Sequence, residues 1–273
     1  MPYSLSAKEF ELTQARAAAY GLIAHGFQYP DGDAISALVD PARWENWPDL
    51  LQKSGGQTEK PLRLLQHAVG GFADCSYDAR RALSQRYDDL FGHAVRGACP
   101  AYEMEYGRNE IIRQASDLAD LAGFYRAFGL EIANGANGRP DHIAAECEFM
   151  SALCSKEAYA QAQGDETNAE ICRDAERTFL RDHLARWLPA LTHRVQDADA
   201  DGFFGALARF ADAFVIDECG IFDIHAGPAT LELRVVDPVL DTQISCGSAG
   251  CGGGEPNEQL VQLGTHTPGS ENR

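Results

Sequence analysis

The sequence predicts an all-α protein, and two observations carry that prediction. Most of the 273 residues lie in segments whose apolar positions recur every three or four residues, as on one face of an amphipathic helix. Only residues 231–236 alternate as a strand does, and one short isolated run cannot build a sheet. At usual helix lengths these segments form a bundle of about eight to ten helices.

The ends of the helices are marked by capping residues, prolines and glycines. A capping box, Ser6 with Glu9, begins a helix that runs to Pro30, and a short second helix starts at Pro41. The same signals predict further helices over residues 61–69, 77–91, 108–130, 140–163, 165–188 and 199–219. From about Asp241 the chain becomes glycine-rich and poor in apolar residues, which predicts a flexible tail.

The composition limits the kinds of partner. The chain has 41 acidic and 23 basic side chains, a formal net charge of -18 and a pI near 4.7. Such a surface repels the phosphate backbone of nucleic acids and attracts a cationic segment. We therefore expect no nucleic-acid partner and, for a polypeptide partner, a basic region.

Two further features predict a cytoplasmic protein with reduced cysteines. No stretch reaches the ~20 apolar residues of a membrane-spanning helix, and the first residues lack the basic and apolar regions of a secretion signal. The eight cysteines are thinly spread, and Cys147 and Cys154 fall on an apolar helix stripe, where a thiol packs as a small hydrophobe. In the tail, Cys246 and Cys251 could pair or bind a metal, although the composition favours flexibility.

Residues 92–107 form a long segment without helical periodicity, broken by glycines and a proline. Loops of this length are often functional. Its acidic and aromatic residues either close over a core or offer a surface to a basic segment; they are Tyr102, Glu103, Glu105 and Tyr106. The sequence therefore predicts a recognition loop here.

A helix start follows the glycine-rich residues 134–139. Pro140 suits a first helical turn, and Asp141 places a carboxylate at the positive end of the helix. His142 and Glu146 lie one turn apart, so this polar end faces protein or a groove. The glycines before it predict a hinge between two halves of the chain.

Two other interpretations of this polar group are open. Asp141, His142 and Glu146 could be only a helix cap with a hydrogen-bonded pair. Alternatively, His142 and Glu146 could be two ligands of a helical metal-dependent enzyme, although the spacing names no third or fourth ligand. Stoichiometric zinc, iron or manganese in purified protein would favour the enzyme.

Several motifs occur in order along the chain. They are Arg16, Tyr20, Phe27 and Pro30 in the first helix, then residues 87–91, 99–107, 118–130 and 140–150. Over roughly residues 10 to 220 this pattern resembles the TorD/DmsD-type chaperones, the maturation proteins of molybdoenzymes. The residues of these motifs are most similar to those of the branch that serves dimethyl-sulfide, ethylbenzene, selenate and chlorate type enzymes.

The resemblance implies an all-helical fold in two halves. The expected N-terminal half covers residues 1–133 with the recognition loop at 92–107; a hinge at 134–139 leads to a C-terminal half at 140–240 and the tail at 241–273. It also implies a non-catalytic cytoplasmic protein, monomeric or dimeric, with no cofactor of its own. Such a protein binds the apo catalytic subunit of a molybdopterin oxidoreductase and assists molybdenum-cofactor insertion before export.

The twin-arginine leader of that subunit is a second expected binding partner, alone or with the folded subunit. The acidic and aromatic residues of the recognition loop, of residues 108–130 and of the helix start at 140 are the expected contacts. The predicted partner-binding residues are Tyr102, Glu103, Tyr106, Asp120, Tyr125, Asp141, His142 and Glu146.

Overall fold

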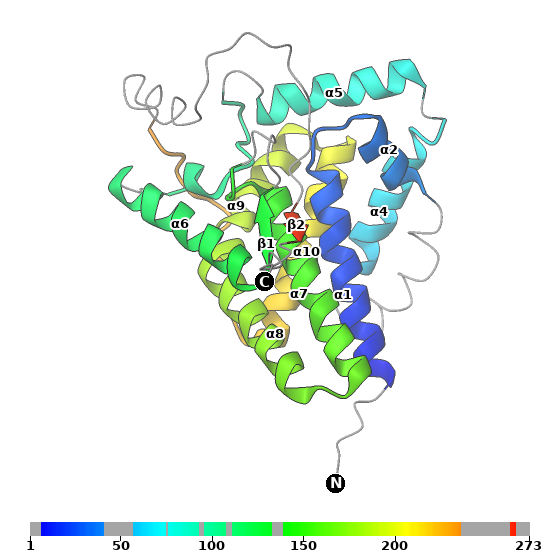
Figure 1. The fold of residues 1–273 in the computed structure, drawn as a ribbon. Helices are drawn as coiled ribbons and strands as arrows, with labels where there is room; N and C mark the ends of the chain where they lie inside the picture. The colour runs from blue at the N-terminus through cyan, green and yellow to red at the C-terminus, as the bar shows by residue number, and fades with distance from the viewer. Residues whose placement is uncertain are drawn as a thin grey trace, which may run out of the picture.

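Helices make up most of the described chain, which the computed structural model covers over residues 7–40, 57–74, 76–92, 96–107, 111–132, 139–235 and 263–265. Figure 1 shows a bundle in which helices from both ends of the sequence pack around one another. The predicted all-α class is confirmed. No helix in these described ranges is long and apolar enough to cross a membrane.

The bundle is built around two helices that run side by side, α1 (Ala7–Gly26) and α7 (Ile143–Gln163) (Figure 1). Small residues allow the two to approach closely, and the hydroxyl of Ser151 donates to the carbonyl of Ala17 at 2.7 Å. The C-terminus of α7 is capped by Gly164, whose φ of 69° is a left-handed conformation that glycine adopts without strain.

The helix that follows α7 continues directly into the next one. Helix α8 (Glu166–Phe179) passes through a π-helical turn, η3 (Leu180–Leu184), into α9 (Ala185–Ala198), and α10 (Phe203–Phe222) packs against α9. The predicted end of a helix at residue 188 was wrong, because α9 continues through Pro189. Proline has no N–H for the carbonyl of Ala185, and that carbonyl instead accepts from the backbone N–H of Gly227 at 2.8 Å.

The N-terminal part supplies α2 (Gly32–Val39), α4 (Glu59–Gly70), α5 (Tyr77–Phe91) and α6 (Ile111–Ala127). The sequence analysis missed α2, a short helix that begins where the carboxylate of Asp31 accepts the N–H of Ala34 at 2.8 Å. The predictions for α4, α5 and α6 are confirmed, whereas the helix expected from Pro41 lies outside the described residues.

Extended structure is limited to short pairings in the described residues. Strand β1 (Leu130–Ile132) pairs antiparallel with β2 (Leu263–Thr265), with Glu131 opposite Gly264. These three tail residues therefore form a strand, while the rest of the predicted tail at 241–273 lies outside the described chain. Within the strand-like run at 231–236, Leu233 forms a single antiparallel bridge with Tyr106.

One hydrophobic core joins the two predicted halves. It contains Phe27 just after α1, Leu65 from α4, Phe149 from α7 and Phe210 from α10, each fully buried. The predicted hinge falls almost entirely outside the described residues, so the division into halves stays a prediction. Because the core is shared, a change in one half is expected to affect the packing of the other.

Candidate functional site

The recognition loop is bonded to the start of α7. Tyr102 and His142 form an antiparallel bridge: the N–H of Glu103 donates to the carbonyl of Asp141 at 2.8 Å, and the N–H of Ile143 donates to that of Ala101 at 2.9 Å. The loop then makes a 3₁₀ turn, η2 (Glu103–Glu105). The two regions that the sequence analysis singled out separately are therefore one structural unit.

Asp141 lies at the centre of this unit and is fully buried. Its carboxylate accepts from Arg139 through Nε at 2.9 Å and Nη2 at 2.6 Å, and from the backbone N–H of Met104 at 3.2 Å. The Arg139 guanidinium also lies over the ring of Tyr102, 4.7 Å from its centroid. A buried carboxylate needs such partners, so Asp141 holds the loop and the helix start together.

His142 caps α7 instead of Asp141. Its Nδ1 accepts the backbone N–H of Ala144 at 3.1 Å. Burial, with the nearby positive charge of Arg139, lowers the pKa of His142 to about 4, so the imidazole is neutral at physiological pH. No group of three or more His, Cys, Asp or Glu within the described ranges is placed to bind a metal, which leaves the metal-enzyme alternative without a ligand set there.

Glu146 and Glu103 are two buried carboxylates with different partners. Oε2 of Glu146 accepts from the indole N–H of Trp187 at 3.1 Å, and its Oε1 has no partner among the described residues. Burial, followed by the negative charge of Glu103, raises the pKa of Glu146, which favours the protonated form. Glu103 in turn faces Nδ1 of His183 at 3.2 Å, and Nε2 of His183 lies 3.7 Å from the exposed carboxylate of Asp120.

The buried Glu105 binds a second set of arginines. Its carboxylate lies 2.8 Å from Arg96, 3.2 Å from Arg234 and 3.8 Å from Arg139. The backbone N–H of Arg234 also donates to the carbonyl of Glu105 at 2.9 Å. Glu105 therefore fastens the segment that follows α10 to the recognition loop, next to the bridge between Tyr106 and Leu233.

Two tyrosines complete the cluster. The hydroxyl of Tyr125 donates to the carbonyl of Pro140 at 2.6 Å, and the ring of Tyr106 packs against Trp187 with centroids 5.3 Å apart. Burial raises the pKa of both phenols, so both stay neutral. Each therefore acts as a packed, uncharged group.

The structure brings all eight predicted partner-binding residues into one region but buries most of them. Asp120 is exposed and Tyr102 is partly exposed, while the other six are buried: Glu103, Tyr106, Tyr125, Asp141, His142 and Glu146. Their partner-binding role stays a prediction. The sequence analysis did not predict that Arg96, Arg139 and Arg234 pair with this acidic cluster. The one sign of it in the sequence is that few basic residues occur in a strongly acidic chain.

A second buried cluster surrounds Arg16, which the sequence analysis noted only as part of a motif. Its guanidinium lies 3.3 Å from Glu157, 2.5 Å from Glu176 and 2.8 Å from Glu218. The hydroxyl of Tyr20 donates to Glu218 at 3.0 Å. Helices α1, α7, α8 and α10 each contribute at least one member, so this cluster ties the four helices together.

Three carboxylates around one guanidinium favour binding a proton. Burial, together with the negative charges of Glu157 and Glu218, raises the pKa of Glu176 to about 7 against the lowering effect of Arg16. Oε1 of Glu176 has no partner in the described part of the chain. Glu176 is therefore the member of the cluster that carries the proton.

The raised pKa of Glu176 predicts that stability falls as the pH rises. The folded state binds this proton more tightly than the unfolded chain, so the stabilisation is complete below the ordinary value of 4.5 and is lost as the pH rises through about 7. We expect Glu176→Gln to remove a pH dependence on the order of 1–2 kcal/mol between about pH 5 and 8. Urea unfolding measures it, with Glu170→Gln on the exposed side of α8 as the control. Equal pH dependence in wild type and Glu176→Gln would contradict the assignment.

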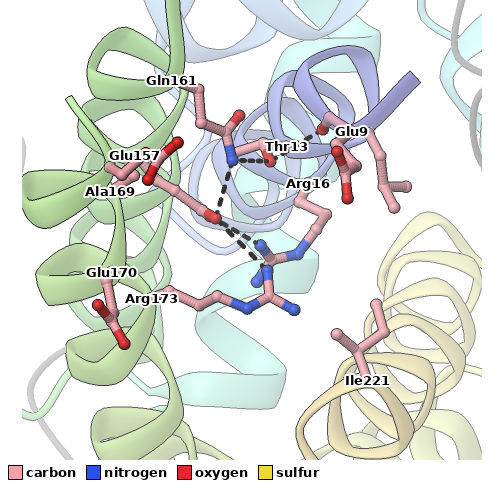
Figure 2. Close-up of a pocket in the computed structure, with 11 residues that line it drawn as sticks. Glu9, Thr13, Arg16, Glu157, Gln161, Ala169, Glu170, Arg173 and Ile221 are labelled. Carbon is pink, nitrogen blue, oxygen red and sulfur yellow. Dashed lines mark hydrogen bonds and ion pairs between the residues drawn. The ribbon is translucent and has the colours of Figure 1, made fainter. Parts of the chain in front are cut away.

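A pocket of about 540 Å³ opens beside the Arg16 cluster (Figure 2). Its walls come from α1, α7 and α8, with Ile221 of α10 on the opposite side. The described chain is thus an all-helical protein in which buried polar groups hold a long loop against a helix start, with a separate pocket between its helices.

Comparison with known proteins identifies the family. A family model described as "Nitrate reductase delta subunit" matches residues 54–193, just over half of the chain. A selenate reductase assembly chaperone protein from Thauera selenatis is 37% identical over 192 residues, covering 68% of this chain and 80% of the relative. A perchlorate reductase assembly chaperone protein from Dechloromonas aromatica is 29% identical over 212 residues, covering 74% and 87%.

A chaperone protein TorD from Vibrio cholerae is 29% identical over 142 residues, covering 50% of this chain and 61% of the relative. The chain belongs to the TorD-type family of redox-enzyme maturation chaperones. The resemblance found in the sequence is confirmed.

Proposed function

We propose that this protein is a non-catalytic cytoplasmic chaperone for the apo catalytic subunit of a molybdopterin oxidoreductase. It holds that subunit during molybdenum-cofactor insertion and before export. The observation that carries the proposal is the similarity, over about two thirds or more of the chain, to proteins named as assembly chaperones of selenate and perchlorate reductase. Those names also support a client from the branch of oxyanion reductases.

The recognition loop, the start of α7, and Asp120 and Tyr125 of α6 form the proposed client-binding element. Asp120 and Tyr102 are its accessible members and contact the client. The six buried members hold the loop and the start of α7 in place beneath them; they are Glu103, Tyr106, Tyr125, Asp141, His142 and Glu146. A rigid scaffold under a polar surface is what specific recognition requires.

The charge of the chain favours a basic contact region on the client. A net charge of -18 attracts cationic segments over about 8 Å at physiological salt. Both a twin-arginine leader and a basic patch of the folded subunit have this character. Steering of this kind raises the association rate, while short-range packing sets the dissociation rate.

The test is client capture by a surface variant. We expect Asp120→Asn to weaken binding of the apo catalytic subunit by about tenfold, the loss of one favourable charged contact. Asp120 is exposed with a side-chain accessibility of 69%, so circular dichroism and the melting temperature should not change. Asp89→Asn on α5 removes one exposed charge elsewhere and is the matched control.

The readout is pull-down of the apo subunit, compared with the cofactor-loaded subunit. Undiminished binding by Asp120→Asn would remove this residue from the contact surface. Equal capture of the apo and loaded subunits would contradict a role in maturation.

A further inference from the structure

The pocket beside Arg16 has a floor of interlocked polar side chains. Figure 2 shows Arg16 in the pocket, with Glu157 and Gln161 on one side of it and Ile221 on the other. Nε2 of Gln161 donates to Glu157 at 3.0 Å and to the hydroxyl of Thr13 at 3.3 Å. The pocket is therefore lined by groups that are already held in place.

The hydrogen-bond donors that line the pocket, Arg16, Arg173 and the amide of Gln161, already donate to carboxylates. Arg16 donates to Glu157 and Glu218, and Arg173 donates to Glu157 at 3.4 Å. A carboxylate only accepts hydrogen bonds, so Gln161 must turn its NH₂ group toward Glu157. Its Oε1 is then a buried acceptor that has no partner in the residues the structure covers.

The charge of the lining is negative. Four acidic side chains, Glu9, Glu157, Glu166 and Glu170, face two arginines, and both arginines are paired with Glu157. Glu218 contacts Arg16 at 2.8 Å and adds to the negative field. An arriving ligand therefore meets an excess of carboxylates over cationic groups.

Apolar side chains form the remaining walls. They are Leu12 of α1, Ala169 of α8 and Ile221 of α10. The volume of about 540 Å³ lies within the range of small-molecule sites in proteins. The combination suits a donor-only cationic head on a short aliphatic stem, because the stem contacts the apolar walls and the head bonds the acceptors.

We propose that this pocket binds a guanidinium or primary ammonium group carried on an aliphatic stem. Such a group is either part of a free small molecule or the side chain of an arginine or lysine in a polypeptide. The first source is independent of the proposed chaperone function. The second rests on that function and adds a contact near the C-terminal end of α7, whereas the recognition loop is bonded to its N-terminal end.

Calorimetric titration of the full chain tests the pocket with three probes. Agmatine carries both cationic groups on a butyl stem, the blocked tripeptide N-acetyl-Ala-Arg-Ala-amide presents an arginine side chain, and N-butylurea is a neutral analogue. We expect one agmatine or one tripeptide per chain, weaker binding at higher salt, and no binding of N-butylurea. Tighter binding of agmatine identifies a free cation as the ligand, and tighter binding of the tripeptide identifies a side chain.

Surface variants locate the binding. The double variant Glu166→Gln/Glu170→Gln removes two exposed carboxylates from the pocket without touching the Arg16 cluster. We expect it to weaken the binding of whichever cationic probe binds more tightly by about tenfold or more. The control Asp78→Asn/Asp89→Asn makes the same change of charge on α5 and should bind as wild type.

Four results would overturn the proposal. They are no binding of either cation at millimolar concentration, equal binding of N-butylurea, an equal effect of the two double variants, and no effect of the pocket variant. Client capture by the same variants keeps the two proposals separate. If the pocket variant loses agmatine binding but captures the client normally, the pocket is a site for a small cation. If the wild type binds agmatine but captures no client, the pocket proposal holds and the chaperone proposal fails.

Discussion

Replacing Arg16 with methionine is expected to lower the free energy of unfolding by about 3–5 kcal/mol, the range for removing one partner of a buried ion pair. Arg16 is 2% exposed, and three buried carboxylates surround it. Without the guanidinium these carboxylates must repel one another, take up protons or draw water into the core. Urea unfolding monitored by circular dichroism measures the loss.

The matched control is Arg63→Met on α4. Arg63 pairs with Glu59 one turn away at 2.8 Å, and its side chain is 65% exposed. An exposed pair of this kind is worth about 0.5 kcal/mol or less. Adding Glu176→Gln and Glu218→Gln to Arg16→Met should restore part of the stability, because fewer buried charges are left unpaired. A loss of similar size for Arg16→Met and Arg63→Met would show that the cluster does not hold the four helices together.

Replacing Asp141 with alanine is expected to cost about 2–4 kcal/mol and to loosen the recognition loop. The substitution leaves the backbone N–H of Met104 without its acceptor, a loss of about 1–3 kcal/mol for a buried donor. It also removes the charge that pairs with Arg139, although Arg139 is 37% exposed in its side chain and can turn to solvent. The loss is therefore smaller than for Arg16.

Hydrogen exchange distinguishes the two effects of Asp141→Ala. Protection should fall for the amides of Glu103 and Met104, which bond to Asp141, and should stay unchanged at Ser151 in the middle of α7. Asp78→Ala on the exposed first turn of α5 serves as the control for global stability. If the loop amides exchanged as in wild type, Asp141 would not be the residue that holds the loop.

These two variants also connect the fold to the proposed function. Asp141 is a buried member of the client-binding element, so its loss is expected to weaken client capture by loosening the recognition loop. Arg16 lies next to the pocket, so its loss is expected to disturb the pocket and the fold together. Client binding should therefore be compared at equal fractions of folded protein.

The amino-acid sequence by itself determined where most of the described helices lie, although it missed α2 and the continuation of α9 past Pro189. Residues 77–91 carry the 3.6-residue period with a serine cap before them, and α5 covers the same residues. The family could also be recognised, because its motifs are short and occur in order. The sequence likewise placed Asp141, His142 and Glu146 together at one helix start, since their spacing alone puts them within a turn of one another.

Tertiary structure alone decided what those side chains face. The periodicity of a helix shows which residues share a side but not which groups from elsewhere pack on that side. The partners of Arg16 lie 141, 160 and 202 positions along the chain, and the His183 that faces Glu103 lies 80 positions away. The path of α9 through Pro189 was also decided at long range, because Gly227 supplies the hydrogen bond that proline cannot. Burial and charge pairing at these sites depend on distant segments that meet only in the folded chain.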